Sequence, residues 1–298
     1  MWVRHTRCAE HELERIAIIG LGLIGGSLGL ALKKAAASDL EIVGFSQSAQ
    51  TRAAAEERGA IDCVASDLVA AVRAADVVVI ATPVMTVRSV LERIASHVPR
   101  GCVVTDTGST KRKVMGWAGK YLASGVSFVG GHPMAGKETS GIGEADAGLF
   151  KGCVYCLTPG PTSTPEAVQR LERLVTAIGA RPFLIDAALH DELVAGVSHL
   201  PMLLSAAFVS ATAGSPSWSE MAKLAAGGYR DMSRLASGNL EMNRDICVTN
   251  REAIIRWIDC YIDELTRYRR LLEGDGEGLA DALARAREAR QRWLEGIR

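Results

Sequence analysis

The sequence lacks a net charge, and with it any field that would attract a large anion. Its 298 residues include 34 basic and 34 acidic side chains. We therefore expect no nucleic acid and no membrane surface among its partners, because both are bound through basic surfaces. Hydrophobic residues make up 48% of the chain and charged residues 23%, which is typical of a globular protein long enough for two domains. The expected partner is a small molecule.

The sequence also lacks the paired cysteines of a secreted scaffold. Its seven cysteines are scattered and odd in number, which favours a reducing, cytoplasmic location. Cys153 and Cys156 form a C-x-x-C pair, but in a strand-like segment residues three apart face opposite sides of the sheet. We therefore expect no metal site. The first 13 residues lack the apolar core of a signal peptide, and we expect no apolar run long enough to span a membrane.

Up to residue 186, short apolar runs alternate with helical stretches. The runs are Ile16–Ile19, Glu41–Phe45, Val77–Ala81, Cys102–Thr105, Ser127–Gly130, Val154–Leu157 and Phe183–Ile185. Strands separated by helices imply a parallel sheet with helices on both faces, and strands that are apolar throughout are buried on both faces. We therefore predict an α/β fold with a Rossmann-type, doubly wound domain over residues 1–186.

Residues 187–298 carry helical signals only, and we assign them to an all-α domain for substrate binding and dimerisation. One predicted helix covers Leu189–Ala213 and contains Pro201, and a longer one runs roughly from Leu240 to Leu272. Apolar residues recur along the second helix at spacings of four and three: Ile254, Ile258, Tyr261, Leu265, Tyr268 and Leu272. Such a seam packs lengthwise on another helix, which favours a homodimer. A core helix within one chain is the alternative.

The first strand is followed directly by a glycine-rich turn, Gly20-Leu21-Gly22-Leu23-Ile24-Gly25, that opens a helix. Glycines allow a tight turn and a close approach of the backbone to a pyrophosphate, while the helix N-terminus offers free N–H groups. At the first strand-to-helix turn of an alternating α/β domain, this motif predicts dinucleotide binding by Gly20, Gly22, Leu23, Ile24 and Gly25. A turn that only packs tightly is the alternative.

The second strand ends without the acidic residue that usually binds the ribose 2′-hydroxyl of NAD. It continues into Ser46, Gln47 and Ser48, with Arg52 nearby. Hydroxyl, amide and guanidinium groups do not repel a 2′-phosphate, so we expect NADP to be at least competitive with NAD. Thr82-Pro83 ends another strand and is expected beside the nicotinamide ribose.

Two polar loops follow neighbouring strands, Asp106–Lys111 and Gly130–Glu138. At the carboxyl edge of a parallel sheet these loops face the cofactor, so Ser109 and His132 are expected to converge on the nicotinamide, with Asp106 and Ser109 also touching the cofactor. The alternative for His132 is a structural histidine bonded only to the backbone.

Five motifs now occur in order along the chain. They are G-L-G-L-I-G-G-S from Gly20, D-T-G-S-T-K from Asp106, G-G-H-P-M-A-G-K-E-T-S-G from Gly130, H-D-E-L-V-A-G-V-S-H-L-P from His190 and Y-R-D-M-S-R-L-A from Tyr229. Through them nearly the whole chain resembles the prephenate/arogenate (cyclohexadienyl) dehydrogenase family. The resemblance implies oxidative decarboxylation of prephenate or arogenate with NAD or NADP, a step of tyrosine biosynthesis in which a ring hydride, a hydroxyl proton and CO2 leave.

The resemblance also implies roles for residues of the central loops. His132 falls on the catalytic histidine, which accepts the proton of the ring hydroxyl and needs a pKa near working pH. Ser109 matches a serine that bonds the same hydroxyl and orients the imidazole. Glu138 aligns with an acid near this cluster, and His199 with a histidine that lines the substrate and nicotinamide side.

Substrate carboxylates are assigned to the helical half by the same resemblance. Arg234 matches the arginine that grips the ring carboxylate, and Asp231 is expected to fix its rotamer. Arg230 is expected to reach the side-chain carboxylate, either within its own subunit or from the partner subunit. An exposed salt pair is the alternative for Asp231 and Arg234. Lys137 and Asn243 depart from the residues common in the family at their positions. Both positions are expected near the substrate side chain and bear on the choice between prephenate and arogenate.

His190 and Asp191 we interpret as a structural pair at the start of a helix. Two other functions remain open at this point. Another Rossmann β-hydroxyacid or imine dehydrogenase explains the glycine motif, and a non-catalytic cofactor-binding dimer module explains the architecture.

Overall fold

The computed structural model describes residues 14–35, 40–137, 139–274 and 276–296. The chain forms two compact units that meet in sequence between Arg251 and Glu252. The larger unit contains the sheet together with the helices that follow it up to Arg251, and the smaller one contains the remaining helices. The domain boundary proposed between residues 186 and 187 stays a prediction.

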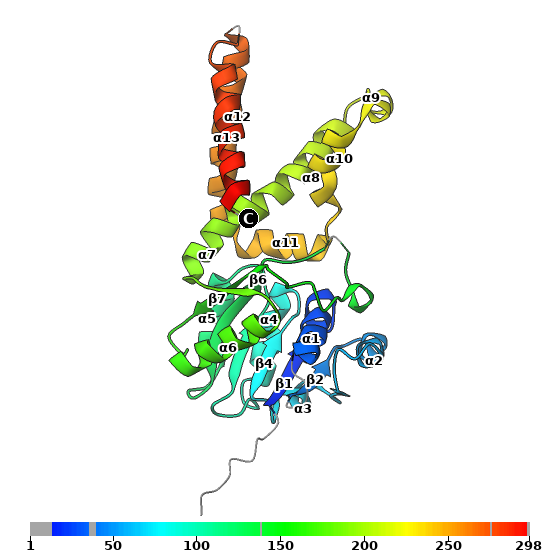
Figure 1. Cartoon of the computed structure of the whole chain (residues 1–298), viewed down its shortest axis with the longest axis vertical. Helices are drawn as coiled ribbons and strands as arrows, with labels where there is room; N and C mark the ends of the chain where they lie inside the picture. Colours follow the sequence, from blue (N-terminus) through cyan, green and yellow to red (C-terminus); the bar gives the residue numbers. More distant parts are fainter. Residues whose placement is uncertain (1–13, 36–39, 138, 275, 297–298) are drawn as a thin grey trace, which may run out of the picture. The chain divides into compact units, whose positions relative to one another are not determined.

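The larger unit is built on one eight-stranded sheet (Figure 1). Its strands are β1 Glu14–Ile19, β2 Leu40–Phe45, β3 Cys63–Val64, β4 Val77–Ile80, β5 Val103–Asp106, β6 Ser127–Pro133, β7 Val154–Pro159 and β8 Arg181–Leu184. They lie in the order β3-β2-β1-β4-β5-β6-β7-β8. The strand order therefore has a switch point at β1, with β2 and β3 on one side of it and β4 to β8 on the other. Dinucleotides bind at such a switch point in open α/β sheets. The predicted Rossmann-type fold is confirmed.

Two details of the sheet differ from the prediction. β3 is a two-residue strand, too short for a sequence signal, and β7 runs antiparallel to β6. A parallel pair needs a crossover, usually a helix. Between β6 and β7 the described residues contain only the short 3₁₀ turn Ile142–Glu144, so the chain returns in the opposite direction. β8 follows the helix after β7 and is parallel to it.

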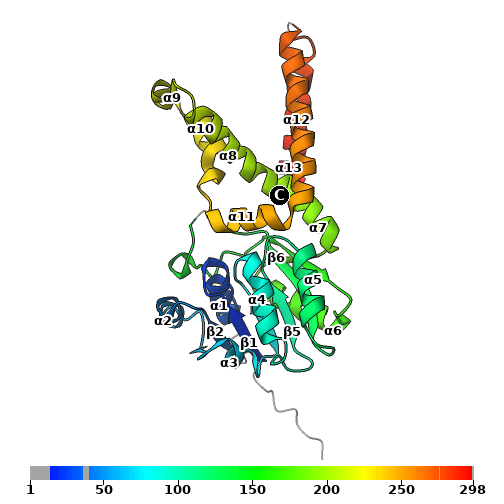
Figure 2. The same ribbon diagram turned by 180° about the vertical axis from the view of Figure 1, so that it is seen from behind.

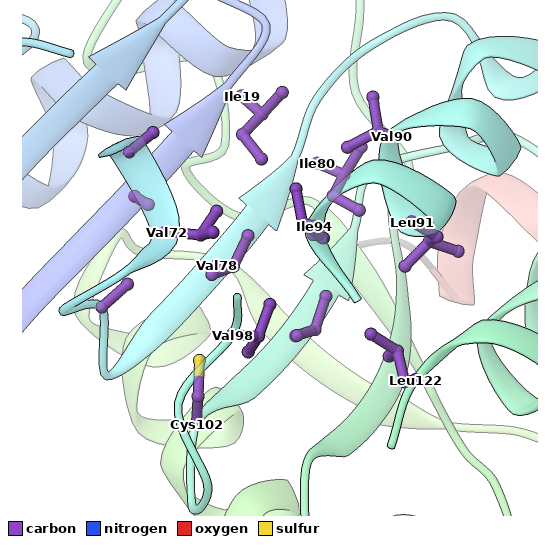
Figure 3. Close-up of a cluster of buried hydrophobic side chains, with 14 of the residues drawn as sticks. Ile19, Val72, Val78, Ile80, Val90, Leu91, Ile94, Val98, Cys102 and Leu122 are labelled. Atoms are coloured by element: carbon purple, nitrogen blue, oxygen red, sulfur yellow. The ribbon is translucent and has the colours of Figure 1, made fainter. Parts of the chain in front are cut away.

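Helices cover both faces of the sheet (Figures 1 and 2). α1 Leu23–Ala35 and α6 Pro165–Ala177 contribute to the apolar cluster on one face; α3 Leu68–Val72, α4 Val84–Ile94 and α5 Arg112–Tyr121 contribute to the other. Alternate residues of β4 enter opposite clusters, with Val78 and Ile80 on the second face (Figure 3). This is why the strands read as unbroken apolar runs. The two apolar cores thus enclose the sheet between helices.

The predicted helix around Pro201 is present, in three parts. α7 Ala187–Val194 leads into a π-helical turn, Ala195–His199, and then into α8 Leu200–Ala213. Pro201 falls in the first turn of α8, where its missing N–H costs least. The π turn directly before it widens the backbone, and such turns are frequent at functional sites.

This segment corrects one expectation. Leu193–Ser219 contains no Asp, Glu, Lys or Arg, and Ala187–Ala213 is long and apolar enough to cross a membrane by length and composition alone. The expectation of no such run is therefore wrong. Only 28% of its most apolar stretch is buried within the chain.

The second predicted helix is divided at Asn250. α11 Leu240–Thr249 ends there, and α12 Arg251–Glu273 begins at the next residue. Asn250 leaves helical geometry with φ −118° and ψ 30°, and its side chain bonds elsewhere. The other described helices are α2 Ala49–Glu57, α9 Trp218–Leu224, α10 Gly227–Ser233 and α13 Leu279–Gly296, with a 3₁₀ turn at Arg234–Ser237.

Candidate active site

The glycine-rich turn after β1 has the geometry that a dinucleotide needs. Gly20 has φ 96°, and a Cβ there would lie 2.5 Å from the carbonyl oxygen of Ala81. At Gly25 a Cβ would lie 1.9 Å from the Gly20 oxygen, so neither position admits a side chain. A Cβ on Gly22 would meet nothing within 4 Å, so the turn opens outward there. The first N–H groups of α1 have no intrahelical acceptor, and these features together fit a pyrophosphate.

The loop after β2 lies where the adenosine ribose of such a cofactor would be recognised. The Arg52 guanidinium donates through Nη1 to the carbonyl oxygens of Ser46 at 2.5 Å and Gln47 at 3.2 Å. Ser48 caps α2, its Oγ accepting from the N–H of Thr51 at 3.1 Å. Arg52 is therefore folded against this loop with no carboxylate among its described hydrogen-bond partners.

Asp106 and Lys111 form a fully buried ion pair at the end of β5. Lys111 Nζ lies 2.5 Å from Asp106 Oδ2 and donates to the Gly131 carbonyl at 2.7 Å, and both side chains are 0% exposed. Asp106 also accepts the N–H groups of Gly108 and Gly131, at 2.8 and 3.1 Å. With both oxygens engaged, Asp106 braces β5 against β6. Its contact with the cofactor stays a prediction.

His132 lies where β6 extends beyond the end of β5. β5 pairs with β6 as far as Val129, whereas β6 continues to Pro133 in pairing with β7. The imidazole is therefore at the carboxyl edge of the parallel part of the sheet, 8% exposed. Its Nδ1 lies 2.9 Å from His190 Nε2, the two rings meeting edge to face. His132 is thus bonded to another side chain, unlike the structural alternative of a backbone contact only.

His199 joins this cluster from the end of the π turn. Asn250 Nδ2 donates to the carbonyl of Asp191 at 2.7 Å, which fixes the orientation of the amide, and it lies 3.2 Å from His199 Nδ1. Nδ1 therefore accepts, and a neutral His199 carries its proton on Nε2. That Nε2 is buried and has no hydrogen-bond partner within the described residues. His199 consequently carries an N–H donor inside the cluster, with the Ser109 backbone in contact with the same residue.

Burial keeps both histidines neutral. It lowers the pKa of His132 well below the ordinary value, and the nearby His190, Lys111 and His199 lower it further. Burial also lowers the pKa of His199 to about 4, against the opposing effects of Asp191 and the Ser109 backbone. The backbone contact places Ser109, half-buried in the loop after β5, beside His199. The expected convergence of Ser109 and His132 thus rests on their common neighbour, His199.

For the other residues predicted to bind substrate, the structure gives no contact with the histidine cluster among the described residues. Lys137 is exposed and donates to the Glu144 carbonyl at 3.1 Å, within its own loop, and Glu138 lies outside the described residues. Arg230 and Asp231 are exposed on α10, and Asn243 on α11 packs against Gly238. Their substrate contacts stay predictions.

Arg234 begins the 3₁₀ turn after α10. Buried Ser205 on α8 fixes the backbone of this turn, its Oγ accepting from the Ala236 N–H at 2.9 Å. The Arg234 side chain is exposed on the protomer. The turn therefore has a defined anchor, while the role of the guanidinium remains a prediction.

The sequence analysis gave no part in the site to four residues of the cluster: Lys111, His190, Asp191 and Asn250. His190 and Asp191 are 0% and 1% exposed, and they contact His132 and the start of α5 as well as their own helix. The interpretation of them as a purely structural pair is incomplete. One signal was available: Asn250 interrupts an otherwise helical pattern, which is typical of a polar residue held by a distant partner.

The comparisons with known proteins point in one direction. Residues 28–184 match the family described as "Prephenate dehydrogenase, nucleotide-binding domain", and residues 186–285 match "Prephenate dehydrogenase, dimerization domain". The chain belongs to the prephenate dehydrogenase family. A prephenate dehydrogenase of Bacillus subtilis is 38% identical over 269 residues, which cover 89% of this chain and 72% of that protein. The family resemblance stated from the motifs is confirmed, and the two alternative functions lose their basis.

Two solved structures are similar over almost their whole length. A prephenate dehydrogenase from A. aeolicus, in complex with hydroxyphenyl propionate and NAD+, has a TM-score of 0.88 at 26% identity, covering 94% of this chain and 98% of that one. A Synechocystis arogenate dehydrogenase has a TM-score of 0.81 at 30% identity, covering 94% and 99%. The protein is accordingly an NAD(P)-dependent oxidoreductase of this family.

Proposed function

We propose that this protein oxidises and decarboxylates prephenate, arogenate or both with NAD(P)+, giving 4-hydroxyphenylpyruvate or tyrosine and CO2. The observation that carries the proposal is the neutral histidine His132, buried at the carboxyl edge of the sheet. Both the family membership and the glycine-rich turn after β1 support it. A cytoplasmic location fits this biosynthetic role.

In this reaction His132 accepts the proton of the ring hydroxyl. Its neutral imidazole holds a lone pair for that proton, while Ser109 bonds the same hydroxyl. His199, as an N–H donor, suits an oxygen of the substrate or of the nicotinamide amide. The bound cofactor, held by the Gly20–Gly25 turn, supplies the hydride acceptor. Exclusion of water by the buried cluster keeps the proton transfer within the site.

A direct assay tests the function. Purified protein is incubated with prephenate or arogenate, each with NAD+ or NADP+, and the absorbance of the reduced nicotinamide is followed together with CO2 release. Turnover of at least one substrate with equal amounts of reduced cofactor and CO2 is expected. Reduction without CO2, or no turnover of either substrate, would contradict the proposal.

The ring carboxylate is assigned to Arg234. Arg234→Gln should raise KM for the substrate roughly 30-fold, about 2 kcal/mol, because a bidentate charge-assisted pair is lost. Arg234→Lys should recover only part of the affinity, since a point charge cannot form the same fork. Arg93→Gln, at an exposed arginine of α4 outside the proposed site, is the control and should leave KM unchanged. An unaltered KM in Arg234→Gln would remove this residue from the substrate site.

The cofactor preference is proposed to include NADP+. The loop Ser46–Ser48 has hydroxyl and amide groups, and the Arg52 guanidinium folds against it. In Ser46→Asp a new carboxylate would repel a 2′-phosphate, so the ratio of kcat/KM for NADP+ to that for NAD+ should fall at least about tenfold. Ser46→Asn, which has the same shape without the charge, is the control. An unchanged ratio in Ser46→Asp would place the adenosine ribose elsewhere.

Homodimerisation through the helical part is also proposed. α8 is largely uncovered, and on α12 the seam residues Leu265 and Leu272 are 52% and 66% exposed. Apolar surface of this extent is characteristic of subunit interfaces. The family's dimerization domain covers the same residues. A partner subunit, and no membrane, is therefore the expected cover of Ala187–Ala213.

A further inference from the structure

His132 is the end of a three-residue chain of side-chain contacts. His132 Nδ1 lies 2.9 Å from His190 Nε2, and His190 Nδ1 lies 2.9 Å from Asp191 Oδ1. All three residues are buried, with His190 fully so. We infer that His190 and Asp191 are positioning residues that hold His132 in the one tautomer able to take a proton from the substrate. The inference rests on the proposed function and extends it to two residues outside the proposed set.

The series of contacts from His132 through His190 ends at Asp191, which is held in place by backbone groups. Its Oδ1 accepts from the Lys111 N–H at 2.7 Å, and its Oδ2 from the Arg112 N–H at 3.0 Å. Lys111 is the N-cap residue of α5 and Arg112 its first residue, so the carboxylate binds the N-terminus of that helix from a different element. A negative charge is stabilised at a helix N-terminus, and its position there is fixed by two bonds. Asp191 is therefore a rigid acceptor at one end of the chain.

The direction of each proton follows from this anchor. An ionised carboxylate only accepts, so His190 carries its proton on Nδ1. A neutral His190 then has a lone pair on Nε2, which accepts from His132 Nδ1–H. The neutral His132 is left with its lone pair on Nε2, the nitrogen that does not face His190. Only this tautomer can accept the hydroxyl proton of a substrate.

The same three side chains also stabilise the positive charge that forms when His132 takes up a proton. When His132 Nε2 takes the hydroxyl proton, the proton on His132 Nδ1 can pass to His190 Nε2. His132 is then neutral again, and the positive charge resides on His190, in contact with the Asp191 carboxylate. The buried site, which disfavours a cation on His132, is thereby provided with a counter-ion one ring away. A Ser-His-Asp triad uses an aspartate in the same sense, to fix a tautomer and stabilise an imidazolium.

A purely structural role predicts something different. In that case the two residues would only tie α7 to α5, and their loss would lower stability without changing the protonation of His132. Asp186 provides the matched control because its Oδ1 caps the same helix α7 by accepting from the Ala188 and Leu189 N–H groups. Asp186→Ala weakens α7 and touches neither histidine ring.

The test combines ¹⁵N NMR of histidine-labelled protein with kinetics. In the wild type, the His132 signals, assigned by their loss in His132→Gln, should show a protonated Nδ1 and a bare Nε2. Asp191→Asn removes the charge that holds a proton on His190 Nδ1, and its amide cannot accept from the Lys111 N–H, the Arg112 N–H and His190 together. The fraction of His132 with a bare Nε2 should therefore fall. We expect kcat to fall about 100-fold or more with little change in KM. Asp186→Ala should keep both the wild-type tautomer and kcat.

A second pair of variants tests the inference if Asp191→Asn does not fold. His190→Gln retains an acceptor for His132 Nδ1–H, whereas His190→Leu does not, so the glutamine variant should keep at least about tenfold more kcat. A proton on His132 Nε2 in the wild type, or equal kcat in the two His190 variants, would overturn the inference. The NMR result requires no turnover, so failure of the proposed function would show separately, as a wild type without activity on either substrate.

Discussion

Replacing His132 by alanine is expected to lower kcat by about two to four orders of magnitude, the usual contribution of a general base, with a smaller change in KM. His132→Asn is the sharper variant, because its amide can still donate to His190 Nε2 and so preserves the buried contact while removing the basic nitrogen. Both variants should lose activity to a similar extent. His97→Ala, at an exposed histidine, should leave kcat unchanged. A His132→Asn enzyme with wild-type kcat would exclude this imidazole from the chemistry.

The pH profile gives an independent measurement of the same group. Only neutral His132 accepts a proton, so kcat/KM should fall as pH drops through its pKa. Because burial lowers that pKa well below 6.5, the wild-type activity should not decline from this group as pH decreases through 6.5. The decline should begin at a more acidic pH and should be absent from the residual activity of His132→Ala. A decline centred on the ordinary histidine pKa would contradict the buried, neutral state of His132.

Replacing Lys111 by methionine is expected to lower the free energy of unfolding by about 3 to 5 kcal/mol. Lys111 and Asp106 are 0% exposed, and removing the ammonium leaves a buried carboxylate without a counter-ion. Urea unfolding followed by circular dichroism measures the effect. Lys111 also lowers the pKa of His132, so the acid decline of kcat/KM in this variant should move to higher pH.

Two further variants isolate the cause. Adding Asp106→Asn to Lys111→Met removes the unpaired charge and should recover most of the lost stability. Lys33→Met removes an ion pair of the same 2.5 Å length, with Asp62, but at a site about one-third exposed. An exposed pair contributes only about 0 to 1 kcal/mol. Equal losses in Lys33→Met and Lys111→Met would show that burial does not govern the Lys111–Asp106 pair.

The parts of the molecule that sequence reasoning predicted well are those with a local cause. The run Val77–Ala81 and the turn from Gly20 to Gly25 depend on residues next to one another in the chain, since strand burial and the strand-to-helix turn are set by short patterns. The antiparallel direction of β7 was not predicted, because the residue pattern of a strand does not show in which direction it runs. The direction depends here on the absence of a crossover helix between β6 and β7 within the described residues.

The contacts that make the site were harder to predict because they are distant in sequence. His132 and His190 are 58 residues apart, Lys111 and Asp191 are 80 apart, and Asn250 reaches Asp191 over 59. Adjacent His190 and Asp191 look like an ordinary helix start, and nothing in their spacing shows that one faces an imidazole and the other caps α5.

The sequence by itself determined the dinucleotide fold, the family and the candidate base, because apolar periodicity and motif order act over short stretches of chain. Only the tertiary structure decided how that base is held: the buried Lys111–Asp106 pair, the donor form of His199, and the line from Asp191 through His190 to His132. The physical reason is that a proton's position depends on which atoms lie within about 3 Å. Folding creates those distances between residues that the chain keeps far apart.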